Sequence, residues 1–357
     1  MSPSIDPPGT PGRRKRYRGS HPRGFDEKYK ERKPEAFPEL VEKVISRGQT
    51  PAGTHRAVLI EEVVQALQPT AGEVYVDATL GHGDHLERIV ERVLPGGRAL
   101  GLDLDPEALE STAARLLARG IPITARRSNF AGLGKTLALE GLRCVDLLLA
   151  DLGVSSMQID DPARGFSFKR EGPLDLRMDR TRGVPAADWI ASLEEDELRA
   201  VLERHGDEPD APRIAALAKA ASSAGKLRST FDLVREILRA KGLGTRWRAS
   251  SPFDQHPAAR TFQAFRIAIN REDENLRQLL RAVPYLLSPG GRVAIITFHG
   301  GEDRTVAAAF QAGLEAGLYA EAPSEPIRPQ ATEVRSNPRC RSARLRWAKA
   351  PRELQGS

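Results

Sequence analysis

The chain has 357 residues, of which 40% are hydrophobic and 29% are charged, as is typical of a globular protein with two domains or with one domain and an insertion. Its formal net charge of +6 favours acidic partners, nucleic acid first, although many proteins of this charge bind none. Two cysteines are too few for a disulfide framework or a cysteine metal cage, and neither a membrane span nor a signal peptide is indicated, so we expect a cytoplasmic protein without a metal site.

Residues 1–54 differ in composition from the rest of the chain. They hold 12 lysines and arginines against 7 aspartates and glutamates, a surplus of 5 positive charges, and few aliphatic side chains. This composition predicts a basic, disordered N-terminal arm. Two functions fit such an arm, a solubilising tail and an electrostatic tether for RNA or ribosomes, and composition does not separate them.

Beyond residue 55 the apolar pattern alternates between helical and strand periods. We expect helices over 57–69, 85–94 and 106–120, and strands over 73–78, 98–105, 122–130 and 145–153. Apolar strands separated by helices predict the α/β class, with a parallel sheet covered on both faces.

The alternation stops after Gly153 and returns about a hundred residues later. We expect a loop over 154–179, helices over 187–206, 211–225 and 230–242 (the last with Thr230 as its N-cap), a helix over 259–287, a turn over 288–291 and a strand over 292–299. We interpret 180–255 as an inserted helical domain. The α/β domain is then discontinuous and consists of 55–179 and 256–352.

The turn after the first strand reads Gly81-His82-Gly83-Asp84-His85-Leu86. A dinucleotide-binding turn has a third glycine where this chain has Leu86. Asp84 would also place an anion where a pyrophosphate needs hydrogen-bond donors. A ligand with phosphates is therefore disfavoured at this turn.

Three aspartates stand at the ends of predicted strands. Asp103 is placed to accept hydrogen bonds from both ribose hydroxyls of a nucleoside, and Asp77 suits the ammonium group of a methionine moiety. Asp151 ends the fourth strand and faces the cleft beyond the sheet, where a transferred group would react. Solvated turn carboxylates are the alternative for Asp77 and Asp103. Together the residues favour S-adenosylmethionine over a nicotinamide dinucleotide.

Longer stretches carry a resemblance to a known family. They are HRAVLIEEVV, YVDATLGHGDH, GLDLDPEAL, DLLLADLGVSSMQIDDPARGFSFKREGPLDLRMD, HPAARTFQAFRIAIN, GGRVAIITFHGGEDR and NPRCRSARLR. Through them the chain resembles the bacterial 16S rRNA (cytosine-N4) methyltransferase family, RsmH or MraW, over nearly everything from His55 to about Trp347.

The resemblance implies a Rossmann-like, S-adenosylmethionine-dependent methyltransferase domain, with the inserted helical domain serving substrate recognition. The implied reaction is methyl transfer to the exocyclic N4 of a decoding-centre cytidine in 16S rRNA. The implied partner is this rRNA within the small ribosomal subunit or its precursor, without a membrane, and both a monomer and a homodimer are left open.

The family's cofactor contacts fall on matching positions of this sequence. They are Gly83, Asp84, His85, Asp103, Phe130, Asp151 and Gln158. Phe130 would offer a flat face to the adenine, with ordinary core packing as the alternative.

The chain departs from the family pattern at two places. The family turn usually reads G-x-G-G-H, and Asp84 stands here in place of the second adjacent glycine, where its charge would repel the methionine carboxylate unless it turns to solvent. The family usually has FHSLEDR where this chain has FHGGEDR, and we expect Gly300 and Gly301 to loosen the segment after the fifth strand.

Candidate residues for catalysis and RNA binding lie beyond the strand ends. Asp151 and the nearby backbone carbonyls are candidates to accept a hydrogen bond from the cytosine amine, and His299 is either a catalytic residue or a structural one. The stretch ARGFSFKR offers cations and aromatic rings for a base that has left its stack, namely Arg164, Phe166, Phe168, Lys169 and Arg170. The alternative for each Phe is packing inside the domain interface.

Four arginines near the C-terminus, Arg339, Arg341, Arg344 and Arg346, alternate as on one face of a strand. A phosphate-binding stripe and a solvated edge strand both fit this spacing.

Two other functions stay open at this point. A nicotinamide-dependent oxidoreductase is disfavoured by Leu86. An RNA-binding protein of the same fold with impaired catalysis is supported only by Asp84 and the Gly300–Gly301 pair.

Overall fold

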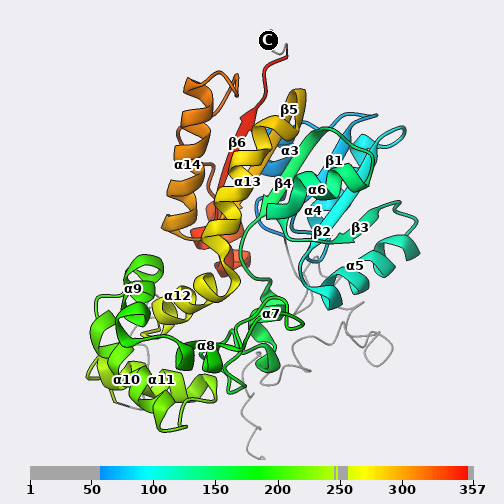
Figure 1. Ribbon diagram of the computed structural model, residues 1–357. Helices are drawn as coiled ribbons and strands as arrows, with labels where there is room; N and C mark the ends of the chain where they lie inside the picture. The colour runs from blue at the N-terminus through cyan, green and yellow to red at the C-terminus, as the bar shows by residue number, and fades with distance from the viewer. Residues whose placement is uncertain (1–56, 245–246, 248–255, 353–357) are drawn as a thin grey trace, which may run out of the picture. The chain divides into compact units, whose positions relative to one another are not determined.

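The computed structural model describes residues 57–244, 247 and 256–352, drawn in colour in Figure 1. The arm predicted over 1–54 lies outside these residues. Among the described helices, none combines the length and the apolar character needed to cross a membrane.

The sheet has six strands in the order β3-β2-β1-β4-β5-β6. They are β1 (Val74–Asp77), β2 (Arg98–Asp103), β3 (Thr124–Arg127), β4 (Val145–Asp151), β5 (Leu287–Thr297) and β6 (Arg344–Lys349). Strands β1 to β5 run parallel, which confirms the predicted α/β sheet, and β6 adds an antiparallel edge to β5. Asp77 pairs with Gly101 on one side and with Leu149 on the other, so Asp103 and Asp151 each lie two residues beyond a neighbour of Asp77.

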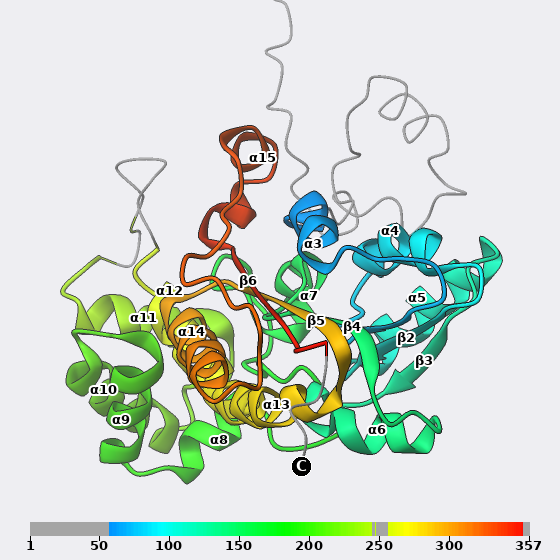
Figure 2. The same cartoon turned by 90° about the horizontal axis from the view of Figure 1, so that it is seen from above.

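Helices cover both faces of the sheet, as predicted (Figure 2). One face carries α3 (Ile60–Leu67), α4 (Asp84–Val93) and α5 (Pro106–Ala118), and the other carries α6 (Leu133–Leu139), α13 (Glu272–Leu286) and α14 (Gly300–Glu315). Each face has its own hydrophobic core. Successive strand residues point to opposite faces, so Tyr75 is buried in the core beneath α3 and α4, and Val76 in the core beneath α6, α13 and α14. This alternation fixes which of the two cores each strand residue joins.

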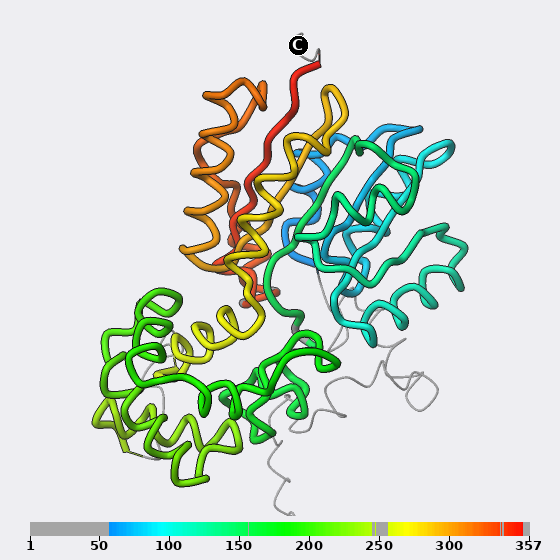
Figure 3. The backbone as a smooth tube through the Cα atoms, in the orientation of Figure 1, coloured from blue at the N-terminus to red at the C-terminus, as the bar shows by residue number. Residues whose placement is uncertain are grey.

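A third core joins the helices α8 (Ala186–Ser192), α9 (Glu195–Gly206), α10 (Ala211–Ser223), α11 (Thr230–Ala240) and α12 (Ala259–Asn270), which gather in one group in Figure 3. It also includes Phe166, Leu174 and Leu176 from the segment that follows β4. The chain from His55 onward forms one compact unit, within which the helical group is not set apart. The division into a domain of 55–179 and 256–352 and an insertion of 180–255 stays a prediction.

The segment expected as a loop over 154–179 contains the short helix α7 (Ser156–Asp160) and the 3₁₀ turn η4 (Pro162–Arg164). It crosses itself closely at Gly172, where an added Cβ would lie 1.8 Å from the carbonyl oxygen of Pro162. Three more short elements are η3 (Phe130–Gly132), α15 (Ala331–Ser336) and η5 (Pro338–Ser342).

Several predicted helix boundaries were wrong, because helix ends depend on caps and backbone angles rather than on periodicity. The helix expected over 187–206 is divided into α8 and α9 by a capping box that begins at Glu194. The helix expected over 259–287 is divided at Arg271, whose φ of 52° is left-handed. Ser229, not Thr230, caps α11, since its side chain accepts a hydrogen bond from the N–H of Asp232.

Two strands also differ from expectation. The third is only Thr124–Arg127, where 122–130 was expected. The fifth begins at Leu287, so the expected turn over 288–291 belongs to β5, beside an irregularity in its pairing with β4.

Candidate functional site

The sheet brings the three predicted aspartates to one edge. Asp77, Asp103 and Asp151 end the adjacent strands β1, β2 and β4, and parallel strands present their carboxyl ends on the same side. The backbone N–H of Asp151 donates to the hydroxyl of Thr79 at 2.6 Å, which ties the end of β4 to the turn that follows β1.

The turn between β1 and α4 is built on left-handed glycines. Gly81 has φ 48° and Gly83, the N-cap of α4, has φ 75°, angles that most other residues adopt only with strain. An added Cβ at Gly83 would also lie 3.0 Å from the methyl of Thr112 on α5. Glycine at position 83 therefore serves both the left-handed turn and its close packing against α5.

Asp103 is oriented by two backbone donors. One carboxylate oxygen accepts a hydrogen bond from the N–H of Gly81 and the other from the N–H of Asp105, each at 2.8 Å. Burial raises the pKa of Asp103, and these two hydrogen bonds oppose the rise. A carboxylate has about four acceptor positions, so these backbone contacts do not exhaust Asp103 as an acceptor for a hydroxyl such as that of a ribose.

Asp77 is buried, with 2% of its surface exposed. It accepts a hydrogen bond from the N–H of Thr79 at 3.1 Å, and the hydroxyl of Tyr75 lies 3.3 Å from its other oxygen. Burial raises the pKa of Asp77 to about 7. A carboxyl with this pKa gains most from a cationic partner, because the cation offsets the desolvation of the charged form.

His85 connects the helix α4 to Asp151. Its Nε2 lies 2.9 Å from the carbonyl oxygen of Val58 and its Nδ1 lies 3.9 Å from a carboxylate oxygen of Asp151. Because a carbonyl can only accept, the Nε2 atom carries a proton in this contact. The imidazole is thus fixed in orientation beside the end of β4.

The two other predicted cofactor residues lie on either side of β2. Phe130 begins η3, is half-buried and packs against the core on the α6 face. Gln158 forms a capping box with Ser155 at the start of α7, and its Nε2 donates to Asp105 at 2.9 Å.

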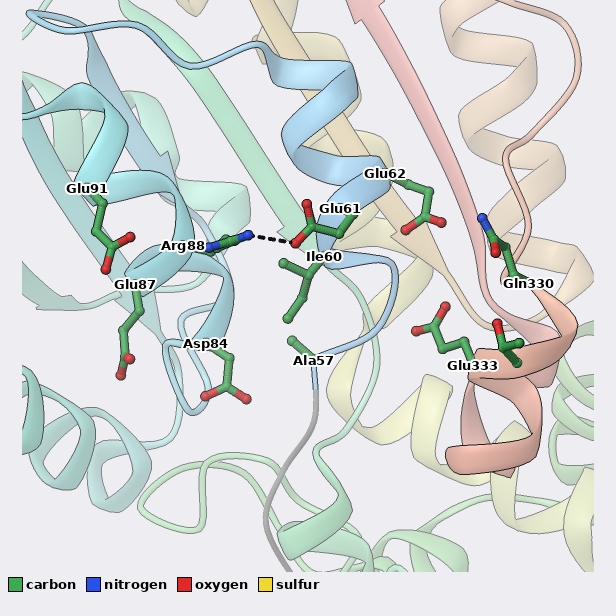
Figure 4. Close-up of a pocket in the computed structure, with 11 residues that line it drawn as sticks. Ala57, Ile60, Glu61, Glu62, Asp84, Glu87, Arg88, Glu91, Gln330 and Glu333 are labelled. Carbon is green, nitrogen blue, oxygen red and sulfur yellow. Dashed lines mark hydrogen bonds and ion pairs between the residues drawn. The ribbon is translucent and has the colours of Figure 1, made fainter. Parts of the chain in front are cut away.

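Asp84 lines a pocket of about 540 Å³ between α3, α4 and α15 (Figure 4). Five other carboxylates line the same pocket, those of Glu61, Glu62, Glu87, Glu91 and Glu333. None of the three strand-end aspartates does so. The predicted repulsion between Asp84 and the methionine carboxylate stays a prediction.

The glycines expected to loosen the segment after β5 belong instead to an ordered helix, so that expectation was wrong. Gly300 and Gly301 form the first turn of α14, a helix of 16 residues. His299 caps this helix, since its Nδ1 accepts a hydrogen bond from the N–H of Glu302 at 3.4 Å. Glu302 is buried, which alone would raise its pKa, but His299, Arg266 and the N–H of Phe298 hold the pKa below its usual value.

The predicted RNA contacts in the segment after β4 have mainly internal partners. The Arg164 side chain is 6% exposed, and its guanidinium pairs with Asp105 at 2.9 Å. Phe166 is buried in the third core. Phe168 is half-buried and stacks on His256, with ring centroids 4.6 Å apart, while the exposed Lys169 places its Nζ 5.9 Å from the Phe168 ring. Contact of these residues with RNA stays a prediction.

The expected strand of four alternating arginines was wrong for its first half. Arg339 and Arg341 lie in the 3₁₀ turn η5, which starts at a proline and cannot continue the β-ladder. Arg344 and Arg346 do lie on β6, and both pair with Asp303 of α14 at 2.7 Å. Arg339 pairs with Asp160 of α7 at 2.9 Å.

Asp105 is an important residue that the sequence-based prediction missed. It caps α5 and also receives Gln158 and Arg164. Aspartate followed by proline is typical of a helix start, so the sequence Asp105-Pro106 predicts the cap. It does not predict the contacts with Gln158 and Arg164. Among the described residues, no group of three or more His, Cys, Asp or Glu side chains is arranged to hold a metal ion.

A mostly parallel sheet with a glycine turn after β1, a ribose-type carboxylate after β2 and a further carboxylate after β4 defines a Rossmann-like protein that binds a nucleoside cofactor. The sequence model of the MraW methylase family matches residues 52–351, and the chain therefore belongs to that family.

Curated relatives agree with this assignment. The chain is 41% identical over 339 residues to "Ribosomal RNA small subunit methyltransferase H 1" of Lachnoclostridium phytofermentans, covering 94% of this chain and 92% of the relative. It is 44% identical over 295 residues to "Ribosomal RNA small subunit methyltransferase H" of Sorangium cellulosum, covering 83% of this chain and 90% of the relative. The predicted family, fold class and methyltransferase activity are confirmed, and a nicotinamide-dependent oxidoreductase is not supported.

S-adenosylmethionine is the cofactor that belongs to this family and fold. The chemistry of the residues at the sheet edge fits it: a carboxylate that can accept from a ribose hydroxyl, a buried acid that gains from a cation, and a glycine turn after the first strand.

Proposed function

We propose that this chain transfers a methyl group from S-adenosylmethionine to the exocyclic N4 of a cytidine in the decoding centre of 16S rRNA. The proposed substrate is the small ribosomal subunit or its precursor, in the cytoplasm. The observation that carries the proposal is the set of strand-end carboxylates beside the glycine turn, in a chain that belongs to a methylase family. The names of the relatives support rRNA as the substrate.

In this proposal the cofactor lies along the carboxyl ends of β1, β2 and β4. Asp103 holds the ribose hydroxyls and Asp77 the methionine ammonium. The backbone of Gly83, Asp84 and His85 borders the methionine end, while Phe130 and Gln158 border the adenosine. The cofactor supplies a methyl group that is already activated, so the protein contributes chiefly binding and alignment.

The second task is to make the cytosine amine reactive. Its lone pair is delocalised into the ring, and an acceptor for its N–H localises that lone pair. As the nitrogen forms its bond to the methyl carbon and the sulfonium bond breaks, the same acceptor stabilises the developing positive charge and receives the proton that the nitrogen loses. Asp151 is the proposed acceptor, because it ends β4 at the sheet edge and its backbone is fixed by Thr79. His85 would orient its carboxylate.

An Asp151→Asn variant tests this assignment. The amide keeps the shape of the side chain but loses the negative charge, so we expect turnover to fall by about 10²-fold or more. Binding of S-adenosylhomocysteine, measured by calorimetry, is the control for the pocket. A variant that binds the cofactor product normally and retains full turnover would remove Asp151 from the reaction.

The overall proposal is tested with the purified chain, S-adenosylmethionine and small ribosomal subunits that lack the methyl group. We expect mass mapping of nuclease fragments to place one new methyl on a decoding-centre cytidine, and nucleoside analysis to identify N4-methylcytidine. Methylation of another base or atom would contradict the proposal. Binding of both ligands without transfer would instead favour an RNA-binding protein with impaired catalysis. A homodimer stays a prediction, which sedimentation velocity would check.

A further inference from the structure

The carboxylate of Asp105 joins the cofactor side of the sheet to the segment that follows β4. Asp105 is 3% exposed. One oxygen accepts hydrogen bonds from the N–H groups of Glu107 and Ala108 and so caps α5. The other oxygen forms an ion pair with the Nη1 of Arg164 and accepts a hydrogen bond from the Nε2 of Gln158, each at 2.9 Å.

On the cofactor side, Asp105 is one hydrogen bond away from the proposed ribose carboxylate. Its backbone N–H donates to Asp103 at 2.8 Å, and the other oxygen of Asp103 accepts from the N–H of Gly81. The chain from the glycine turn through Asp103 to Asp105 is therefore continuous. A ribose that binds the Asp103 carboxylate therefore contacts the same group that accepts the backbone N–H of Asp105.

On the other side, Arg164 extends the connection to the helical region. Its Nη2 donates to the carbonyl oxygen of Met178 at 2.7 Å, and its own carbonyl accepts from the N–H of Leu176 at 3.2 Å. Asn270 of α12 then binds both partners, since its side chain accepts from the N–H of Met178 and donates to the carbonyl of Leu176, each at 2.8 Å. The segment from Ser155 to Met178 is thus held between the ribose strand and α12.

The contact between Asp105 and Arg164 is costly to break, because it would leave two buried charges without partners. Arg164 and Asp105 are both buried charges, and a buried charge that loses its partner is strongly unfavourable. Arg164 contacts the Asp105 carboxylate with Nη1 and the Met178 carbonyl with Nη2, so the planar guanidinium fixes the distance between these two partners. Phe168 and the exposed Lys169, which are predicted to contact RNA, follow Arg164 in the same segment.

We propose that Asp105 and Arg164 are positioning residues that couple occupancy of the cofactor site to the order of segment 155–170, so that bound cofactor strengthens RNA binding. This inference rests on the proposed function and adds a reciprocal coupling between its two ligands. By linkage, bound RNA strengthens cofactor binding by the same factor.

The test is a binding cycle on the full-length chain. The dissociation constant for unmethylated small ribosomal subunits is measured with and without saturating S-adenosylhomocysteine. We expect the wild-type chain to bind the subunits at least about 5-fold more tightly with S-adenosylhomocysteine, within the usual range of such couplings. In Arg164→Gln we expect the ratio to fall below about 2-fold, and in Arg164→Lys to lie between these values.

Arg177→Gln is the matched control. Arg177 lies in the same segment and pairs with the buried Asp175 at 2.7 Å, but no contact of its side chain reaches Asp105 or Gln158 in the described structure. We expect this variant to keep the wild-type coupling ratio even if it loses stability. A merely structural contribution of Arg164 would lower stability in both variants and leave the ratio unchanged in both.

A second variant guards against misfolding of the first. In Asp105→Asn with Arg164→Met no buried charge is left unpaired, and the asparagine still caps α5. Hydrogen exchange of amides 155–170 gives an independent readout: S-adenosylhomocysteine should slow exchange in the wild-type chain and in Arg177→Gln, but not in this double variant.

The outcomes separate the two proposals. A wild-type chain that neither binds S-adenosylhomocysteine nor methylates the subunits contradicts the proposed function itself. An active wild-type chain without coupling, or an Arg164 variant and a double variant that both keep it, overturns the positioning inference alone.

Discussion

At the residue scale, the site depends on a few carboxylates whose surroundings differ. Burial raises the pKa of both Asp103 and Asp77, and hydrogen bonds oppose the rise in each: backbone donors at Asp103, and Thr79 with the hydroxyl of Tyr75 at Asp77. The pKa of Asp77 is raised to about 7, so this carboxyl titrates near neutral pH. Burial also raises the pKa of Tyr75 well above its usual range, so this hydroxyl keeps its proton there.

We expect the affinity for S-adenosylhomocysteine to rise with pH because of Asp77. Below pH about 7 the carboxyl is protonated and cannot pair with an ammonium, so binding should strengthen about 10-fold between pH 6 and pH 8. Calorimetry measures this dependence. In Asp77→Asn the affinity should be weaker and its pH dependence largely lost, and an unchanged slope in that variant would assign the titration to another group.

The same pKa fixes the sign of a stability effect. The folded protein without cofactor holds the Asp77 proton up to pH about 7, whereas the unfolded chain releases it near the usual value of 3.8. The folded state binds the extra proton in this window, so the contribution of Asp77 to stability decreases as pH rises from about 4 to 7. Asp77→Asn should remove that decrease in urea unfolding.

At the element scale, caps decide where helices begin near the site. The cap of α14 comes from His299, and the buried Glu302 in the first turn of this helix depends on the same imidazole. His299 caps the helix through Nδ1 and pairs with Glu302 through Nε2 at 3.2 Å, so its predicted part in catalysis requires a variant that separates these functions.

Asparagine and alanine at position 299 provide that separation. Asparagine is a good N-cap but cannot replace the ion pair between the Nε2 of His299 and the buried Glu302, 3.2 Å apart, so we expect His299→Asn to lose part of the unfolding free energy. His299→Ala loses the cap as well, which should cost about 1 kcal/mol more. Thermal or urea unfolding measures both. If the cap is the whole contribution, His299→Asn also keeps turnover within a few-fold. A stable asparagine variant with turnover reduced about 10²-fold would instead place His299 in the reaction.

At the scale of the whole molecule, most of the net charge lies in one segment. Residues 1–54 carry a surplus of 5 positive charges within a net charge of +6 for the chain. Many of the described arginines are paired with carboxylates, as Arg344 and Arg346 are with Asp303. The arm is therefore the strongest sequence candidate for long-range attraction to rRNA.

We expect replacement of Arg13, Arg14, Lys15, Arg16 and Arg18 by glutamine to weaken binding to small ribosomal subunits and to reduce its dependence on salt. Each lost phosphate contact should lower the slope of log K against log salt by about 0.7–0.9. Lysine at the four arginine positions, with Lys15 retained, is the control, because it preserves the charge. Equal slopes for all three chains would leave the arm as a solubilising tail.

The sequence by itself determined the features that arise within one strand and its following turn. The glycine turn, Asp77, Asp103 and Asp151 are visible there, because a strand period followed by a turn fixes both the element and the residue at its end. The order of the parallel strands then places these residues together at one edge. Local spacing was therefore enough to predict the fold class and the carboxylates that the sheet gathers at one edge.

Tertiary structure alone decided the partners of charges that are distant in the chain. Arg164 lies buried against Asp105, a partner that the sequence did not predict, and Arg344 and Arg346 of β6 pair with Asp303 of α14. The sequence contains these charges but not the distances between them. Whether a charge faces solvent or a buried partner depends on desolvation and geometry that exist only once the segments have packed.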